Sequence, residues 1–234
     1  YVGNKGTRIS GSDDYNPARD VNAAIYIPGA SMFDNTQERR PYQDFSFVGG
    51  IVSAHNSHYH SGQLTVEKRF AQGLSLLASH TWAKAIDDTG WTNPFDRTFD
   101  HGIAREDVAH NFKLSSIYEI PRMRLTGFAG AILNGWGITT NVAWRGGFPF
   151  QVRSGRDNSF SGVGGDRADF IGTDINAAQL SSDRPHGEMV AQYFDTSLFV
   201  QNAEGTFGNT GKNVLRGPKS FITDLGVLKT THIT

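Results

Sequence analysis

Apolar and polar residues alternate with a period of two along several stretches of the chain. Within 59–70, Gln63 and Thr65 fall on one face while Leu64 and Val66 fall on the other. Successive side chains of a β-strand point to opposite faces of the sheet, so this alternation predicts strands rather than helices. The stretches with this pattern are 59–70, 74–86, 108–120, 135–152 and about 220–230, with a weaker, glycine-interrupted one at 45–54.

Turn and breaker residues separate the predicted strands. Ala71-Gln72-Gly73 is typical of a short hairpin turn. Pro121 ends the strand at 108–120, since proline has no amide hydrogen to donate to a ladder. No stretch combines helical periodicity with capping residues. The sequence therefore predicts an all-β, antiparallel structure.

The lengths of strands and loops distinguish between two kinds of β protein. The predicted strands span about 12–14 residues, whereas strands of soluble domains usually have about 5–6. The connections 87–107 and 154–218 are long and polar, which is unusual inside a compact soluble domain. Membrane barrels of the outer-membrane type combine short periplasmic turns with long extracellular loops. We therefore expect an antiparallel transmembrane β-barrel segment, with a soluble β-sandwich as the alternative.

Aromatic residues are spaced as the two edges of a membrane barrel require. Trp136 and Trp144 share a face eight residues apart, which is about 26 Å along a strand at ~3.3 Å per residue. At a strand tilt of about 40° this projects to roughly 20 Å, near the ~25 Å height of the apolar band. In a sandwich the same two residues would be core tryptophans. The predicted lipid-facing aromatic belt consists of Trp82, Tyr118, Trp136 and Trp144.

The alternation also predicts which residues share each face of the wall. The lipid-directed face, whose side chains we expect to be exposed, carries Leu74, Leu76, Trp82, Phe112, Leu114, Tyr118, Trp136, Ile138, Val142 and Trp144. The opposite face, which we expect to line a polar lumen, includes Lys113, Glu119, Asn141 and Arg145.

The N-terminal part of the chain gives a less regular pattern. If the turn at 71–73 lies on the periplasmic side, residues 55–58 should form a turn on the outer side. Residues 45–54 should then form a separate strand that runs toward the outside. One descending strand must then lie within 10–44, with Val21–Ile27 as the candidate.

Composition excludes several classes of protein. Lys+Arg number 22 against 23 Asp+Glu, so the chain lacks the basic excess of a nucleic-acid binder. With no cysteine, disulfide scaffolds and Cys-ligated zinc are excluded. No apolar run approaches the ~18 residues of a transmembrane helix. The sequence begins at Tyr1 without an apolar leader and stops within a strand-like run, so we expect a segment of a longer protein.

Enzyme motifs are missing from the sequence. It contains no GxSxG, HExxH or P-loop pattern, so we expect neither catalysis nor a cofactor. His55, His58 and His60 are close in sequence, but their setting indicates an exposed turn rather than a metal site. Asp87-Asp88 is interpreted as a solvated pair of carboxylates where a strand leaves the membrane.

One polar, glycine-rich loop is a candidate ligand site. Gly162, Gly164 and Gly165 permit tight turns that would let nearby carboxylates converge on calcium or a polar ligand. The spacing matches no EF-hand, so solvated loop residues remain the alternative. The candidate ligand-binding residues are Asp157, Asp166, Arg167 and Asp169.

Several blocks resemble one family of membrane proteins. The segment 64–88, which includes EKRFAQGLSLLASHTWAKAIDD, is similar to a hairpin of TonB-dependent outer-membrane receptors, closest to the Oar-like subfamily. Further blocks resemble the family in its order: Tyr1–Thr7, Arg40–Tyr42, Asp107–Phe112, Tyr118–Pro121, 135–150 and Gly205–Pro218, the last reading GTFGNTGKNVLRGP. Departures are His80 for tyrosine, Ala109 for arginine, and Trp144-Arg145 for glutamine and serine.

The resemblance implies that residues 1–234 are part of one barrel domain of about 22 strands, with the plug and N-terminal domain absent. It implies a Gram-negative outer-membrane location and energised uptake or translocation of an unidentified solute or polymer. The implied partners are outer-membrane lipid, a TonB-type energy-transducing complex reached through parts absent here, and the transported ligand. The alternative is a surface-binding or adhesion protein that uses its long loops.

The loops are where we expect ligand recognition, because functional residues concentrate on loops held by a rigid scaffold. Gly205–Pro218 should be ordered and fold back toward the rim, with Phe207 and Leu215 as apolar anchors. The stretch 157–169 should be more mobile, because it has little apolar anchoring beyond Phe160.

Overall fold

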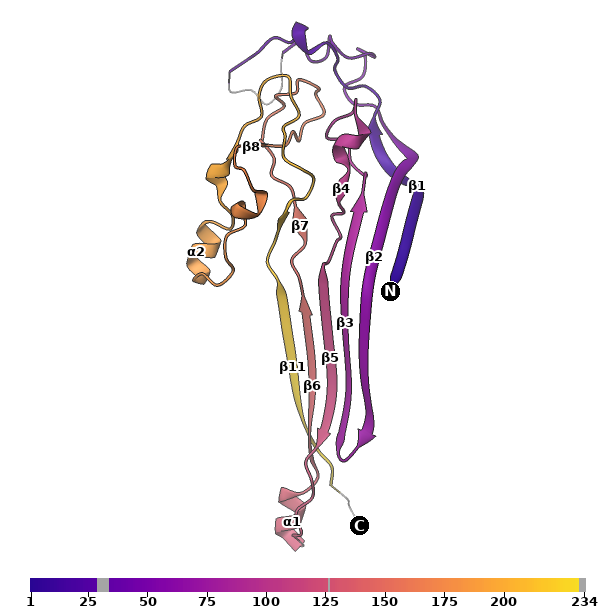
Figure 1. Ribbon diagram of the computed structural model, residues 1–234, viewed down its shortest axis with the longest axis vertical. Helices are drawn as coiled ribbons and strands as arrows, with labels where there is room; N and C mark the ends of the chain where they lie inside the picture. The colour runs from indigo at the N-terminus through magenta and orange to yellow at the C-terminus, as the bar shows by residue number, and fades with distance from the viewer. Residues whose placement is uncertain (29–33, 126, 232–234) are drawn as a thin grey trace.

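One antiparallel sheet forms a long wall that runs through most of the molecule (Figure 1). The computed structural model describes residues 1–28, 34–125 and 127–231. In the order β1-β2-β3-β5-β6-β11, the strands of the wall are β1 (Val2–Asp14), β2 (Gly49–Ala71), β3 (Leu74–Asp87), β5 (His110–Glu119), β6 (Trp136–Arg145) and β11 (Ser220–Lys229). The short β4 (Gly102–Ile103) adds to β3.

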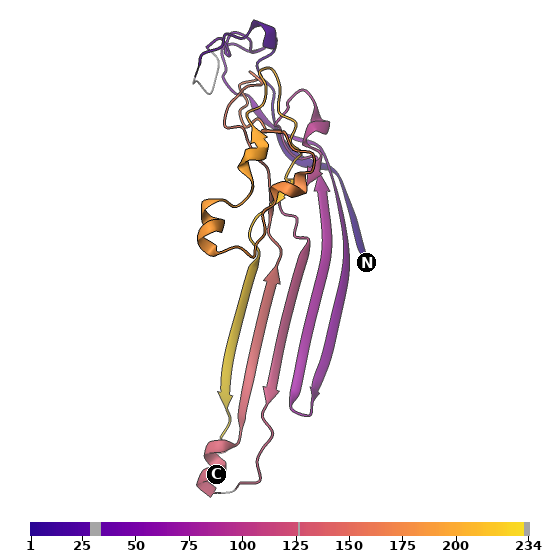
Figure 2. The same ribbon diagram turned by 60° about the vertical axis from the view of Figure 1, so that its left-hand side comes forward.

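The wall is open. Every neighbouring pair of strands is antiparallel, and β1 and β11 form its two edges. The strands curve together in the second view (Figure 2). Long antiparallel strands were the sequence-based prediction, and they are confirmed.

The wall has two different ends (Figure 1). At the turn end lie the β2–β3 hairpin turn and α1 (Gly127–Leu133). At the loop end lie the long connections, with their small elements η1 (Val21–Ala23), η2 (Arg97–Asp100), β7 (Pro149–Phe150), β8 (Asp169–Phe170), η3 (Ile175–Ala178), α2 (His186–Ala191), η4 (Thr196–Leu198), β9 (Phe199–Val200) and β10 (Leu215–Arg216). Within the described residues, none of the helices has the length and apolar character to cross a membrane.

The hairpin between β2 and β3 is held by a two-residue turn. Gln72 and Gly73 have φ values of 54° and 79°, the pair of positive angles found in the tight turns that suit twisted strands. A Cβ on Gly73 would lie 2.7 Å from the Glu119 carbonyl oxygen, so a side chain has no room there. The predicted short turn is confirmed.

The β5–β6 connection at the same end is longer than a simple turn. It contains α1, whose last turn accepts hydrogen bonds through the carbonyl of Ile132 from Trp136 Nε1 at 2.8 Å and from Lys229 Nζ at 3.1 Å. Lys229 Nζ also lies 5.1 Å from the Trp136 ring centroid. The expectation of only short turns on this side therefore fails at one connection.

Strand register places the predicted lipid-directed residues on one face. Leu114 pairs with Ala78 on one side and Val142 on the other, and Phe112 pairs with Trp144, so these side chains share a face. Of the ten predicted residues none is buried: Trp82, Tyr118, Trp136 and Ile138 are exposed and the other six are half-buried. β11 extends this face with three strongly exposed residues, Phe221, Leu225 and Val227.

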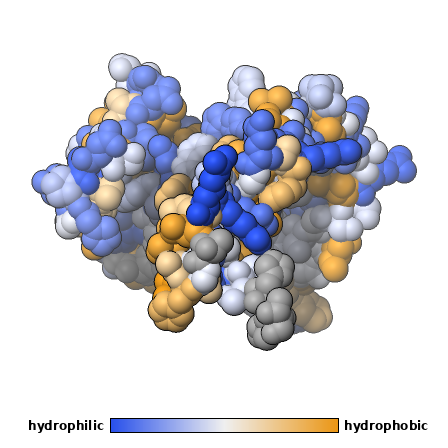
Figure 3. Space-filling model, turned by 90° about the horizontal axis from the view of Figure 1, so that it is seen from below, coloured by the Kyte–Doolittle hydropathy of each residue, from blue (hydrophilic) through white to orange (hydrophobic). Residues whose placement is uncertain are grey.

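The wall has almost no hydrophobic core of its own. Among the described residues, the buried hydrophobic side chains are Ala18, Ala83, Ala104, Phe160, Ala168, Ala178 and Leu215, and only Ala83 belongs to a long strand. A sandwich of two sheets would bury its apolar face, so the sandwich alternative is wrong. Seen from the turn end, hydrophobic surface reaches the outside next to hydrophilic surface (Figure 3).

The opposite face of the wall is mixed rather than uniformly polar. Lys113 and Asn141 lie there as predicted, and register adds Asp224. Exposed apolar residues interrupt this polar surface, namely Leu77, Ile117, Ile222 and Leu228.

The N-terminal topology differs from the sequence-based prediction. Residues 49–54 and 59–70 belong to one strand of 23 residues, β2, which runs straight through the predicted outer turn at 55–58, whereas 45–48 lie before its start. β1 pairs with its upper half, from Val2 opposite Ser61 to Asp14 opposite Gly49.

No descending strand crosses back within the described part of 15–48, and Val21–Ile27 contains only η1. The physical reason is that the upper part of β2 extends past the apolar band. A strand in water needs no alternating apolar face, so its polar sequence looked like a turn.

The two faces give different responses to a buried charge. Val142→Arg or Leu64→Arg should destabilise the assembled barrel by roughly 2–4 kcal/mol, because arginine must enter the apolar band near its middle. The measurement is a folding titration of the full-length protein in lipid vesicles. Asn141→Arg, one residue away on the other face, is the matched control and should change assembly little. Equal losses for Val142→Arg and Asn141→Arg would contradict the assignment of faces.

Candidate functional site

The loops gather at one end of the wall into a single body, which we call the loop cap (Figures 1 and 2). It consists of residues 15–28, 34–48, 88–109 and 146–219. In the described chain most buried residues lie in this cap or at the strand ends beneath it, and buried polar or charged residues outnumber buried hydrophobic ones. The cap is therefore held together mainly by polar contacts.

Arg167 is the largest fully buried side chain among the described residues, at 1% exposure. Its guanidinium pairs with the Asp100 carboxylate and donates from Nη1 to the carbonyl oxygens of Phe99 at 3.1 Å and Thr210 at 3.2 Å. The guanidinium carbon lies 4.4 Å from the Phe99 ring centroid. Burial lowers the pKa of Arg167, and the adjacent Asp100 opposes that shift. Arg167 thereby joins three segments that are distant in sequence.

Two further ion pairs fasten the segment Gly205–Pro218 to the end of the wall. Lys212 pairs with Asp87 and also donates to the Thr89 carbonyl at 2.6 Å, and Arg216 pairs with Asp107. These contacts are buried or half-buried, so water screens them poorly. The prediction that Gly205–Pro218 folds back against the rim is confirmed.

Both predicted apolar anchors of that segment make contacts. Leu215 is 1% exposed, in the strand β10 that pairs with β7. The Phe207 ring packs edge-on against Phe95 and Phe99, at centroid distances of 6.3 and 6.0 Å.

The interpretation of Asp87-Asp88 as a solvated pair is wrong. Asp87 is buried against Lys212. Asp88 accepts hydrogen bonds from the backbone and side-chain nitrogens of Asn56 at 2.6 and 3.2 Å. Burial favours a higher pKa for Asp88, but these bonds, with His55 nearby, hold the pKa below its usual value. The error arose because the partners lie in β2 and in the distant Gly205–Pro218 segment.

Asp157 and Asp166, two of the predicted ligand residues, lie together in the cap. Ser159 connects them: its hydroxyl donates to Asp157 at 3.0 Å and lies 2.8 Å from Asp166, while its backbone nitrogen donates to Asp166 at 2.7 Å. Gly162 N donates to Asp157 at 2.8 Å, and Asn202 Nδ2 to Asp166 at 3.2 Å. Burial raises the pKa of Asp166, and the bonds from Ser159 and Asn202 act in the opposite direction.

The other two predicted ligand residues point to different partners. Asp169 accepts from the backbone nitrogens of Ala203 at 3.2 Å and Asn209 at 2.8 Å, while Arg167 turns toward Asp100. The polar atoms of all four residues thus hold the cap together. Their role in binding a ligand stays a prediction. The mobility expected of 157–169 rested on a lack of anchors, and this hydrogen-bond network supplies them.

The histidine cluster is not an exposed turn. His55 lies within β2 at 1% exposure, with Nδ1 3.0 Å from the Asp88 carbonyl oxygen and Nε2 3.7 Å from Asp13 Oδ1. His58 and His60 belong to the same strand but point to its other face. Across the described ranges, no three His, Asp or Glu side chains are grouped to hold a metal ion.

The sequence-based reasoning missed Arg40 as a structural residue. It is buried and donates to the carbonyl oxygens of Asn16 at 2.5 Å and Gly162 at 3.2 Å, with Asp14 at 3.7 Å. A signal was present, because Arg40 begins one of the blocks that resemble TonB-dependent receptors. Asp107, Lys212 and Arg216 also lie in such blocks.

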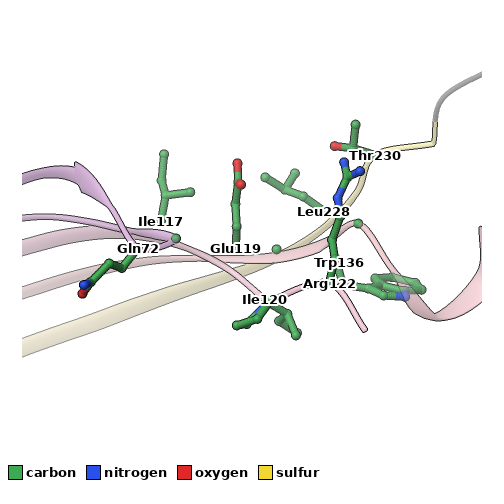
Figure 4. A pocket seen from close by; sticks show the side chains of 12 residues that line it. Gln72, Ile117, Glu119, Ile120, Arg122, Trp136, Leu228 and Thr230 are labelled. Carbon is green, nitrogen blue, oxygen red and sulfur yellow. The ribbon is translucent and has the colours of Figure 1, made fainter. Parts of the chain in front are cut away.

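A recess lies at the turn end, and its lining comes from both faces of the wall, with Glu119 from the inward face and Trp136 from the lipid-directed face (Figure 4). Its volume is about 440 Å³, and its walls come from the ends of β5, β6 and β11. Ile117 and Glu119 point to the same side, with Leu228 beside them. The recess mixes apolar and charged groups and is a second candidate for contact with material inside a barrel.

The buried ion pairs of the cap make a testable prediction. Arg167→Met leaves Asp100 buried without its cation and should destabilise the cap by about 3–5 kcal/mol. The measurement is hydrogen exchange of cap amides in the full-length protein. Adding Asp100→Asn should recover part of the loss, because the unpaired charge is removed.

The matched control is Arg69→Met, which breaks an ion pair with Glu67 in which the arginine side chain is 91% exposed. This substitution should change the opening free energy of the cap amides by less than about 1 kcal/mol. Unaltered cap exchange in Arg167→Met would contradict the structural role of this pair.

Comparison with known proteins gives one clear assignment. The family described as "Outer membrane beta barrel domain" matches residues 1–234. No curated protein and no solved structure matches the chain. The family agrees with the long antiparallel strands, the exposed apolar face and the aromatic residues at its two ends. The chain therefore belongs to the outer-membrane β-barrel domain family and resides in the bacterial outer membrane.

Proposed function

We propose that the chain is part of the barrel of a TonB-dependent receptor, of Oar-like type, that takes up or translocates a solute or polymer with energy from the periplasmic side. The observation that carries the proposal is where the receptor-like blocks lie. Asp107–Phe112 and Gly205–Pro218 supply Asp107, Lys212 and Arg216, which fasten the cap to the wall. A receptor needs such a firm attachment, because its loops must present a constant surface to arriving solutes.

The two faces of the wall suit this role. The outward face contacts lipid, and the inward face carries Lys113, Asn141 and Asp224, groups that can contact hydrated material in a lumen. In this proposal residues 1–234 are one portion of a single barrel domain. The plug and the contact with the energy-transducing complex belong to other parts of the protein.

The proposal includes no catalysis. The buried carboxylates Asp87, Asp100 and Asp107 are held by cations, and Asp157 and Asp166 by hydrogen bonds, which suits structural rather than catalytic roles. Of the predicted ligand residues, Asp157, Asp166 and Arg167 are buried, so in this proposal they act by holding the loops that meet an arriving solute.

A surface-binding or adhesion protein is the second candidate. The observation in its favour is the size and internal bonding of the loop cap, which an adhesin needs as much as a receptor does. The two functions differ in one respect, because uptake requires energy whereas adhesion does not.

Energy dependence provides the test. Cells with and without the full-length gene are grown in a mixture of solutes, and depletion of each solute from the medium is measured. We expect the gene to allow depletion of at least one solute, and a protonophore to abolish that depletion while binding at the cell surface persists.

The protonophore also defines the opposite outcome. The opposite result is that no solute is depleted while cells attach to surfaces in a way that depends on the gene but resists the protonophore. That result would contradict the receptor function and favour adhesion. A strain that lacks the energy-transducing complex serves as the control and should behave like protonophore-treated cells.

A further inference from the structure

A small group of basic side chains lies on the lipid-directed face just beyond its aromatic row. That row contains Trp82, which pairs with His110, and His110 lies 6.0 Å from the Trp144 ring centroid. Beyond it, β1, β2 and β3 continue toward the loop end. We call Lys5, His58, His60 and Lys84 the basic patch.

Strand register puts the patch on one surface. Lys84 is directly opposite His60, and His58 is directly opposite both Ile86 and Lys5. Residues directly opposite in an antiparallel pair share a face, and Lys84 shares its face with Trp82 two positions earlier in β3. The four side chains thus lie in two neighbouring rows.

The two lysines have no acidic partner among the described ion pairs. Lys5, His60 and Lys84 are exposed, and His58 is half-buried. Asp88, four residues beyond Lys84 and farther from the aromatic row, has its oxygens occupied by hydrogen bonds from Asn56. The patch therefore presents uncompensated positive charge.

The position of the patch relates it to the membrane surface. Lys84 follows Trp82 by two residues, or about 7 Å along the strand at ~3.3 Å per residue. Tryptophan at the edge of the apolar band marks the level of the lipid headgroups, and lysine side chains beyond it reach into the headgroup layer. The loop end corresponds to the outer leaflet, because long loops of these barrels are extracellular.

We propose that the basic patch binds the phosphate groups of an anionic lipid in the outer leaflet and so holds the projecting β1–β2–β3 extension against the membrane surface. A lipid fits better than a free anion because the patch continues into exposed apolar side chains, Leu64, Val66 and Trp82, on the same face. Acyl chains contact these residues while the phosphates of the same molecule meet the lysines.

Neighbouring polar groups add hydrogen-bond donors to the site. In the sheet His58 pairs with Lys5 and His60 with Lys84, and the Tyr1 hydroxyl is 2.5 Å from His60 Nδ1. Lysine acts on phosphate as a compact charge, while imidazole and hydroxyl groups contribute directional bonds.

The test uses the full-length protein in nanodiscs of phosphatidylcholine, with diphosphoryl lipid A as the probe and native mass spectrometry as the readout. Each of Lys5→Gln and Lys84→Gln should weaken lipid A binding about fivefold, in line with the attraction of one lysine to an anionic surface. In the double variant, lipid A binding should weaken by the product of the two individual factors. Binding to the unsubstituted protein should weaken at high salt.

Lys68→Gln is the matched control, because Lys68 is exposed on the same face but near the turn end. It should bind lipid A as the unsubstituted protein does. Heat-dependent migration on gels verifies that each variant forms a barrel.

Three outcomes would overturn the proposal. The first is unchanged binding of lipid A by the double variant in a folded barrel. The second is an equal loss in Lys68→Gln, which would mean that only overall charge matters. The third is displacement of the lipid by inorganic phosphate at comparable concentration, which would identify a free-anion site instead of a lipid site.

Discussion

Every backbone amide and carbonyl that crosses the lipid interior must find its partner within the protein, because the bilayer core offers none. The rest of the structure depends on this constraint. Continuous ladders between β2, β3, β5, β6 and β11 satisfy the backbone and fix the register. Register then assigns each side chain to the lipid or to the interior, which places Val142 and Asn141 on opposite surfaces. With its apolar side chains turned outward, the wall cannot also form a hydrophobic core.

The loop cap solves a different physical problem. It lies in water and buries few apolar side chains among the described residues, so its segments are joined by buried charges and hydrogen bonds. Arg167 with Asp100, Lys212 with Asp87 and Arg216 with Asp107 join residues that are far apart in sequence. Buried ion pairs of this kind give little net stability but penalise alternative arrangements, since each unpaired partner is costly. The cap therefore has one defined arrangement at the loop end of the wall.

Local pattern predicted the wall well and the cap poorly. Alternation located β3, β5 and β6, and the residues around Gly73 indicated the turn, because each signal depends only on neighbouring residues. Residues 55–58 of β2 were taken for a turn, since a paired strand in water has no apolar face to reveal it. Asp87 was read as solvated because its cation, Lys212, lies in a distant segment. Asp157 was read as ligand-binding although the nearby Ser159 and Gly162 donate to it. Lys212 nevertheless lies inside a block that resembles receptors, so the resemblance carried structural information that the alternation lacked.

The central claim is that the two faces of one wall meet lipid and interior respectively, and the 1–234 segment contains no cysteine to interfere with spin labelling. Nitroxide labels at Val142→Cys and Asn141→Cys in the full-length protein, reconstituted in lipid, would report the environment of each face. Power-saturation measurements with oxygen and with a water-soluble nickel complex compare the two sites directly. The structure predicts that oxygen relaxes the label at 142 more strongly and the nickel complex the label at 141. The reverse order, or equal nickel accessibility at both positions, would contradict it.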